Sequence, residues 1–361
     1  MSRGRFTGLL IAALVVLAAA LYLGSRRNSG EPSAEGMRFL PQLAGTLGTV
    51  SQIDLQKSTP TAGVTLHRAG DQWTVAQRAD YPADASKVHK LLLSLADAKI
   101  VEEKTSNPAN FSIIGVEDPA KPGAAGTQIT LTTKDGTHSV IVGKPTGEGN
   151  FARRGGEDKS FTVAPAISAD VEPRAWIDGR LLDIPAAQIQ SIDAKPAAGA
   201  GYTLHRLKAG EDGFAFDGAP PAGRKLLDPR GLAPSPTALS GLSADDLAAA
   251  SDIDFSKPSQ AVFTLADGNI ITLTGTVAGD KRWVEVQATK DAGLNTKTQN
   301  RAFEVASYRF DAIFRPLEQL LVPKETKPAA QPAAPAKVGR GGAKPLAPHA
   351  AAPGSTPAPT P

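Results

Sequence analysis

The body of the chain is dominated by short runs in which apolar and polar residues alternate. The run Val64-Thr-Leu-His-Arg68 returns almost unchanged as Tyr202-Thr-Leu-His-Arg206. A period of two places Val64 and Leu66 on one face of a β-strand and Thr65 and His67 on the other. Both runs follow an Ile-Asp pair and precede an Asp-Gly between apolar stretches, at Ile53-Asp54, Ile192-Asp193, Asp135-Gly136 and Asp267-Gly268. The sequence therefore predicts an internal duplication of a β-rich unit.

The first unit is expected to combine several hairpins with one helix. Val88, Leu91, Leu92 and Leu95 recur at helical spacing, and Asp84 stands where an N-cap is expected. Such a helix would bury its apolar face against a sheet. The expected hairpins turn at Gly70-Asp71, at Asp135-Gly136 and between Asn150–Arg153 and Ser160–Val163.

The second unit repeats this plan with an interrupted helix. Pro229, Pro234 and Pro236 break the helical region, so only a short helix capped at Ser235-Pro236, and carrying Leu239 and Leu242, is expected there. Residues 300–321 are expected to form a closing helical segment. Residues 165–183 join the units, and Trp176 with Leu181-Leu182 indicates that this junction is packed.

The two ends of the chain have a different composition. Phe6 to Leu23 contains no charge and is long enough, at about 1.5 Å per residue, to cross a bilayer. A cleaved signal peptide ending near Ala18-Ala19-Ala20 is the alternative, but the apolar run continues through Leu23, which favours an uncleaved anchor. From Lys324 the chain is rich in Pro, Ala and Lys, which is typical of a disordered tail.

These patterns predict an α+β protein: an N-terminal transmembrane helix, then two related, mainly antiparallel β units, each with a packed helix, then a disordered tail. The expected divisions are an anchor at residues 1–27, a polar spacer at 28–45, the first unit at 46–175, the second unit with its closing helix at 176–323, and the tail at 324–361. The predicted transmembrane helix, Phe6 to Leu23, would attach the chain to the cytoplasmic membrane.

Composition narrows the classes of function. The chain has no cysteine, which excludes disulfides, a thiolate nucleophile and a cysteine zinc site. The net charge of +3 comes from Arg3, Arg5, Arg26, Arg27 and the basic tail, so the body between them is acidic. An acidic body argues against a nucleic-acid partner.

A search for chemistry finds no catalytic, cofactor-binding or metal-binding residues and predicts no cofactor. His67 and His205 occupy equivalent places, which suggests a paired metal site or proton switch, but retention on the polar face of an ancestral strand is the preferred interpretation. The other histidines, His89, His138 and His349, have no ligand spacing around them. The adjacent carboxylates Glu102-Glu103 and Asp245-Asp246 are expected to be solvated, and the glycine-containing stretches 147–149 and 339–344 lack the context of a phosphate loop.

The order of these motifs resembles the bacterial domain-of-unknown-function 4340 proteins. The resemblance covers about residues 50–285. It is carried by the N-terminal span, Ile53-Asp54, Leu66-His-Arg68 and Trp73, Tyr81-Pro-Ala-Asp84 with its leucine stripe, Val142-Gly143, Phe151–Arg153, Phe161–Val163 and Arg180-Leu-Leu-Asp183. It implies an envelope protein, often encoded beside gliding-motility-type ABC transporters, with no established catalytic residues.

We therefore expect a non-enzymatic, single-pass protein of the bacterial cytoplasmic membrane, with its body in the periplasm or outside the cell. It would be an accessory or binding protein for an ABC-type transporter, with a permease or related envelope protein as partner. The alternatives are an envelope glycan or peptidoglycan binder and, behind it, a hydrolase with a site between the two units.

Overall fold

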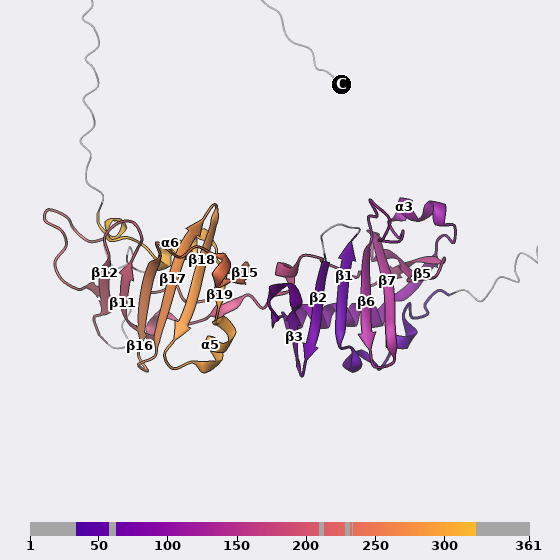
Figure 1. Cartoon of the computed structure of the whole chain (residues 1–361), viewed down its shortest axis with the longest axis horizontal. Helices are drawn as coiled ribbons and strands as arrows, with labels where there is room; N and C mark the ends of the chain where they lie inside the picture. The colour runs from indigo at the N-terminus through magenta and orange to yellow at the C-terminus, as the bar shows by residue number, and fades with distance from the viewer. Residues whose placement is uncertain (1–33, 58–62, 209–212, 228–231, 233, 323–361) are drawn as a thin grey trace, which may run out of the picture. The chain divides into compact units, whose positions relative to one another are not determined.

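The computed structural model describes residues 34–322, apart from residues 58–62, 209–212, 228–231 and 233 (Figure 1). The predicted anchor at Phe6 to Leu23 and the predicted tail at 324–361 lie outside the described residues. Within the described part of the chain, no helix is long and apolar enough to cross a membrane.

The first half of the chain forms a nine-stranded antiparallel sheet, in the order β4-β3-β2-β1-β6-β7-β8-β9-β5 (Figure 1). Its centre is the predicted alternation: Ile53 of β1 lies between Leu66 of β2 and Leu131 of β6, and all three side chains are fully buried. The strands are β1 (Gln52–Lys57), β2 (Gly63–Ala69), β3 (Gln72–Val75), β4 (Tyr81–Pro82), β5 (Lys99–Glu103), β6 (Thr127–Thr133), β7 (Gly136–Pro145), β8 (Asn150–Arg154) and β9 (Ser160–Ala164).

The second half forms an eight-stranded sheet whose order, β13-β12-β11-β16-β17-β18-β19-β15, is that of the first sheet without β4. Ile192 of β11 lies between Leu204 and Phe263, as Ile53 lies between its partners. The strands are β11 (Ile189–Lys195), β12 (Tyr202–Arg206), β13 (Phe214–Phe216), β15 (Asp246–Ala249), β16 (Ser259–Leu265), β17 (Ile270–Ala278), β18 (Lys281–Ala288) and β19 (Arg301–Glu304).

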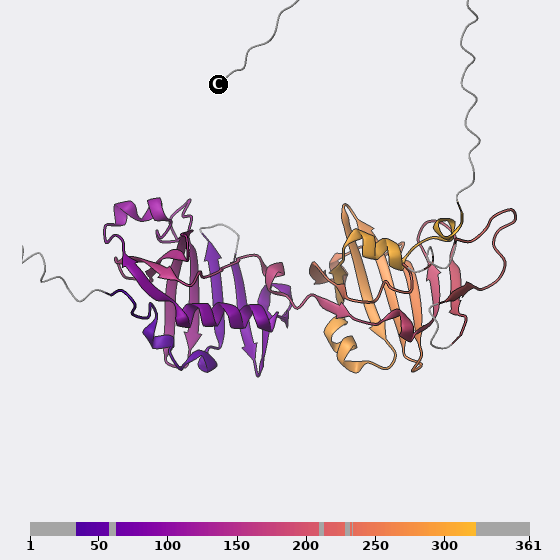
Figure 2. The same cartoon turned by 180° about the vertical axis from the view of Figure 1, so that it is seen from behind.

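Helix α2 (Ala85–Asp97) covers one face of the first sheet (Figure 2). The side chain of Asp84 accepts hydrogen bonds from the backbone N–H groups of Ser86 and Lys87, as predicted for an N-cap. The buried side of the helix is the predicted stripe, Val88, Leu91, Leu92 and Leu95, together with Ala96. A further single-turn helix, α3 (Phe111–Ile114), follows β5.

The prediction of a short helix at Ser235-Pro236 is wrong. Residues 234–241 form consecutive turns, and Leu242 belongs to β14 (Leu242–Ser243). Pro234 and Pro236 explain this, because each removes a backbone donor and disfavours the helical conformation of its predecessor. The second sheet is covered instead by α5 (Ala292–Thr298) and α6 (Ser307–Ile313); Phe310 and Phe314 lie so close to Gly275 of β17 that a Cβ there would be 2.2 Å from the Phe314 ring.

Two further expectations need correction. The closing helical segment begins later than residue 300, because Arg301–Glu304 is strand β19 and Phe303 is one of its buried residues. The polar spacer does not extend through residue 45 as an independent linker: Phe39, Leu40 and Leu43 are buried, and the backbone N–H of Phe39 donates to the carbonyl of Ala98. These apolar side chains stabilise the segment against the sheet edge at β5.

Candidate functional site at the junction of the two sheets

The segment that joins the two sheets is the candidate site, because it brings together charged residues from distant parts of the sequence. It begins with the 3-10 turn η5 (Pro173–Trp176) and continues into β10 (Arg180–Leu182), which pairs with β14. The backbone N–H of Asp178 donates to the carbonyl of Pro82 in β4, and the N–H of Ala244 donates to the carbonyl of Gly179. Trp176, Leu181 and Leu182 are buried, which confirms the predicted packed junction.

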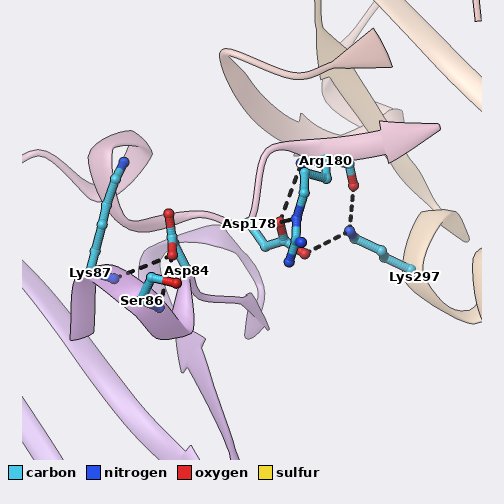
Figure 3. A network of polar contacts seen from close by, with 6 residues as sticks. All are labelled: Asp84, Ser86, Lys87, Asp178, Arg180 and Lys297. Atoms are coloured by element: carbon cyan, nitrogen blue, oxygen red, sulfur yellow. Dashed lines mark hydrogen bonds and ion pairs between the residues drawn. The ribbon is translucent and has the colours of Figure 1, made fainter. Parts of the chain in front are cut away.

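Asp178 is the central acid of this junction (Figure 3). Its carboxylate accepts hydrogen bonds from Arg180 Nε at 2.9 Å and from Lys297 Nζ at 3.1 Å. The same Lys297 ammonium donates to the backbone carbonyl of Arg180 at 2.5 Å. Burial alone would raise the pKa of Asp178, but the two hydrogen bonds and the Lys297 charge outweigh burial and hold that pKa below its usual value. Asp178 is therefore a stable carboxylate that anchors two cations.

A second charged contact joins the same regions. The guanidinium of Arg78, at the end of the 3-10 turn η3 (Ala76–Arg78), pairs in bidentate fashion with the carboxylate of Asp246 in β15. Arg301 Nη2 adds a hydrogen bond to the carbonyl of Ala79 at 3.0 Å. A bidentate pair fixes both the distance and the orientation of its two side chains. These contacts therefore attach an edge of the first sheet to an edge of the second.

Tyr81 lies between these charges. Its side chain is fully buried and meets the ring of Phe303 edge-on, with centroids 5.7 Å apart. Lys297 Nζ and the Arg301 guanidinium carbon lie 5.5 Å and 5.6 Å from the centroid of the Tyr81 ring. Burial, followed by the charge of Asp178, raises the pKa of Tyr81 far above its usual range, against the smaller effect of Arg301. Tyr81 is therefore a neutral phenol that supplies an aromatic face to two cations.

The junction residues are suited to holding structure together. Asp178 is ionised and engaged by two cations, and Tyr81 keeps its proton, so neither has the near-neutral pKa that general acid or base catalysis favours. In the described ranges, no group of three or more His, Asp or Glu side chains is arranged to hold a metal ion.

The structure explains the repeated Thr-Leu-His-Arg run. In both copies the threonine hydroxyl donates to the aspartate of the neighbouring strand, Thr65 to Asp54 at 2.8 Å and Thr203 to Asp193 at 3.4 Å. The arginine that ends each copy donates to a backbone carbonyl. Arg68 donates to Gly48, shortly before β1, and Arg206 donates to Ile189, the first residue of β11. The preserved residues therefore support the central strands.

The two histidines of these runs are not brought together as a site. His67 and His205 are exposed residues in different sheets, opposite Gln52 and Ser191 respectively. His67 Nδ1 lies 3.8 Å from Asp80, an exposed carboxylate. The preferred interpretation, a shared position on the polar face of related strands, agrees with this placement.

The other sequence candidates have mixed outcomes. Glu102 and Glu103 are exposed and pair with Lys104 and Lys159, as expected of solvated carboxylates. The expectation that Asp246 is solvated is wrong, since its side chain is almost buried against Arg78. Gly147-Glu-Gly149 lies in the turn between β7 and β8 and leads into a strand, so no helix follows it. The stretch 339–344 lies outside the described residues.

Sequence reasoning missed the charged residues of the junction, namely Arg78, Asp178, Lys297 and Arg301. Their partners lie 119 residues away for Lys297 and Asp178, and 168 residues away for Arg78 and Asp246, so no local spacing links them. The available signal was indirect: Tyr81-Pro-Ala-Asp84 and Arg180-Leu-Leu-Asp183 belong to the motif order noted above, and both flank the junction.

Comparison with known protein families identifies the family of this chain. The family model of the domain of unknown function DUF4340 covers residues 73–335, a range that starts after β2 and runs across both sheets and the junction. No curated protein and no solved structure matches the chain. Because the family model covers well over half of the sequence, the chain belongs to the DUF4340 family.

Proposed function

We propose that this chain is a non-enzymatic, membrane-anchored binding protein of the bacterial envelope that acts as an accessory to an ABC-type transporter. The proposal has three parts, which rest on different support: the absence of a catalytic role for the junction, the attachment to a membrane, and the kind of partner.

The non-enzymatic part rests on one observation, the commitment of the junction charges to each other. Asp178 is held by Arg180 and Lys297, and Asp246 accepts both hydrogen bonds of a forked guanidinium from Arg78. A catalytic carboxylate needs a free face toward substrate and a pKa suited to proton transfer. These groups instead join two sheets into a scaffold, which is what a protein that presents binding surfaces requires.

The membrane and partner parts rest on the sequence. The uncharged run Phe6 to Leu23 supports a single span, and the large body that follows without a second such run supports placement of that body outside the cytoplasm. The transporter as partner is what the motif resemblance implies for this family. Its permease would meet the body at the outer surface of the membrane.

The test is affinity purification of the full chain from its native membrane in a mild detergent. Specific recovery of transporter subunits, identified by mass spectrometry, is the expected result. Recovery that persists with an anchor-only control lacking residues 46–322 would contradict a role for the body, and failure to recover any transporter subunit would remove the transporter from the proposal.

A further inference from the structure

A pocket of about 280 Å³ opens beside helix α2, where the helix faces the segment between β9 and η5. The helix contributes Lys87, Lys90 and Leu91, and the facing segment contributes Asp170 and Trp176. All of these residues belong to α2, which packs on the first sheet, and to the segment that leads into the junction. The pocket is therefore independent of the contacts that the second sheet makes.

The floor of the pocket is apolar and fixed in place. Leu91 and Trp176 are 3% and 4% exposed, respectively. The indole N–H of Trp176 donates to the backbone carbonyl of Asp170 at 2.8 Å, so the ring makes its hydrogen bond within the protein. A floor of this kind favours an aliphatic group; it offers no exposed aromatic face for stacking on a sugar ring.

The rim of the pocket carries charge of both signs, with cations in excess. Lys87 Nζ donates to the carbonyl of Ala175 at 2.7 Å, which holds its ammonium at the rim; Figure 3 shows the side chain extending from the start of α2. Lys90, one turn later, is exposed and has no hydrogen-bond or ion-pair partner in the described part of the chain. Asp170 faces them with a carboxylate that accepts from the N–H of Glu172. Two ammonium groups and one carboxylate favour a ligand with one net negative charge.

We propose that this pocket binds the C-terminal carboxylate of a polypeptide chain that ends in an aliphatic residue. The carboxylate would lie against Lys90, with Lys87 beside it, and the last side chain would rest on Leu91 and Trp176. The last backbone N–H would face the acceptor, Asp170. The charge of the rim and the apolar floor both fit this occupant. The volume fits as well, because a pocket near the lower limit for small-molecule sites holds one or two residues and excludes an acyl chain.

The second half differs from the first at the position that corresponds to α2. Where α2 covers the first sheet, residues 234–241 of the second half form turns that contain Pro234 and Pro236. The proposal therefore gives the first half a recognition role of its own. It rests on the proposed function in one respect, namely that the ligand is part of a partner protein.

The probe for this site is N-acetyl-Ala-Leu with a free carboxylate. The full chain in mild detergent, labelled with 5-fluorotryptophan, gives one fluorine resonance for each of its three tryptophans, Trp73, Trp176 and Trp283. Single Trp→Phe variants at positions 73 and 283 assign two signals and leave the third to Trp176. We expect the probe to shift the Trp176 resonance saturably, and to leave the other two unmoved.

Matched variants make the test specific. Lys90→Met removes the free ammonium and should weaken probe binding about tenfold, since a charge-assisted hydrogen bond to the carboxylate is lost. Lys134→Met, in the exposed turn between β6 and β7, is the control and should leave binding unchanged. Ala166→Trp places bulk in the exposed lining of the pocket and should abolish binding without touching the core.

The carboxyl amide of the same peptide should bind at least about tenfold more weakly than the acid. Four results would each overturn the proposal. Two are equal binding of the acid and the amide, and equal binding by Lys90→Met and the unaltered chain. The other two are a shift of the Trp176 resonance by N-acetylglucosamine instead of the peptide, and no shift at millimolar probe. Transporter capture is measured separately. If the probe binds but no transporter is captured, the pocket proposal is supported and the transporter proposal is contradicted. If the transporter is captured but the probe does not bind, the transporter proposal is supported and the pocket proposal is contradicted.

Discussion

The guanidinium of Arg78 and the carboxylate of Asp246 form two parallel hydrogen bonds, Nε to Oδ1 at 2.6 Å and Nη2 to Oδ2 at 2.9 Å. Their side chains are 23% and 13% exposed, respectively. The pair joins the turn η3 beside the first sheet to β15, an edge strand of the second sheet, across 168 residues of sequence. Its geometry and partial burial distinguish it from an ordinary surface ion pair, whose contribution to stability is small.

Arg78→Met should lower the free energy of unfolding by about 2 to 3 kcal/mol, because it leaves the carboxylate of Asp246 nearly buried without its cation. Arg78→Lys should be intermediate, since an ammonium cannot form the forked pair. The measurement is urea unfolding of the full chain followed by tryptophan fluorescence.

Arg180→Met is the matched control for this prediction. Arg180 also pairs with an aspartate of the junction, but its side chain is 90% exposed, so its removal should change stability far less. Equal effects of the two substitutions would contradict the structural role assigned to the pair of Arg78 and Asp246.

The acid sensitivity of the junction should depend on Asp178. Its pKa is lower in the folded protein than the value of 3.8 for a free side chain. A lowered folded pKa contributes stability that is present above the unfolded pKa and is lost as pH falls through the folded pKa. We therefore expect the contribution of Asp178 to begin to fall near pH 4 and to be lost as the pH drops further through the folded pKa.

Two variants check this prediction in urea unfolding measured between neutral and acidic pH. Asp178→Asn should flatten the decline in stability at acidic pH. Lys297→Met removes a hydrogen bond and a charge that lower the pKa of Asp178, so the folded pKa should move toward that of a free side chain and the decline should become smaller. An unchanged pH profile in both variants would show that the linkage arises from other carboxylates.

Local patterns predicted the sheets and the first helix well. Alternation at Val64–Arg68 and Tyr202–Arg206 corresponds to paired strands, because strand pairing between neighbours depends on local periodicity. The Asp-Gly turns belong to the hairpins β6–β7 and β16–β17. The Asp84 cap and the leucine stripe identified α2 for the same reason. In the second half, Pro234 and Pro236 correctly predicted that the helix is interrupted, but the short helix predicted at Ser235-Pro236 is replaced by turns.

The junction could not be predicted in the same way. The position of Asp246 depends on which strand lies at the edge of the second sheet and on what meets that edge, and neither is encoded in nearby residues. As a result, Asp245-Asp246 looked like an ordinary solvated pair. The pocket beside α2 was hidden for a related reason: Lys87 and Lys90 lie on the polar side of the helix, and only the folded segment carrying Asp170 and Trp176 turns that side into a binding surface.

Tyr81 and Tyr202 provide opposite predictions for the same substitution. The hydroxyl of Tyr81 is buried and has no hydrogen-bond partner in the described part of the chain, whereas that of Tyr202 lies 3.1 Å from the hydroxyl of Ser235. Tyr81→Phe should therefore be neutral or stabilise the protein by up to about 1 kcal/mol, and Tyr202→Phe should destabilise it by about 1 kcal/mol. Thermal and urea unfolding of both variants would measure the difference. Clear destabilisation by Tyr81→Phe would instead indicate that this hydroxyl is hydrogen-bonded.

Gly147 and Gly149 lie in one turn, between β7 and β8, and should respond differently to alanine. The turn is closed by a hydrogen bond from the N–H of Thr146 to the carbonyl of Gly149. A Cβ at position 149 would lie 1.7 Å from the carbonyl oxygen of Val163 in β9, whereas a Cβ at position 147 would meet nothing within 4 Å. Gly149→Ala should therefore force β8 and β9 apart and cost about 2 to 3 kcal/mol, while Gly147→Ala should be neutral or slightly stabilising. Comparison of the two variants by urea unfolding decides whether Gly149 is kept for backbone packing. Tolerance of alanine at position 149 would reopen the question of why this turn contains two glycines.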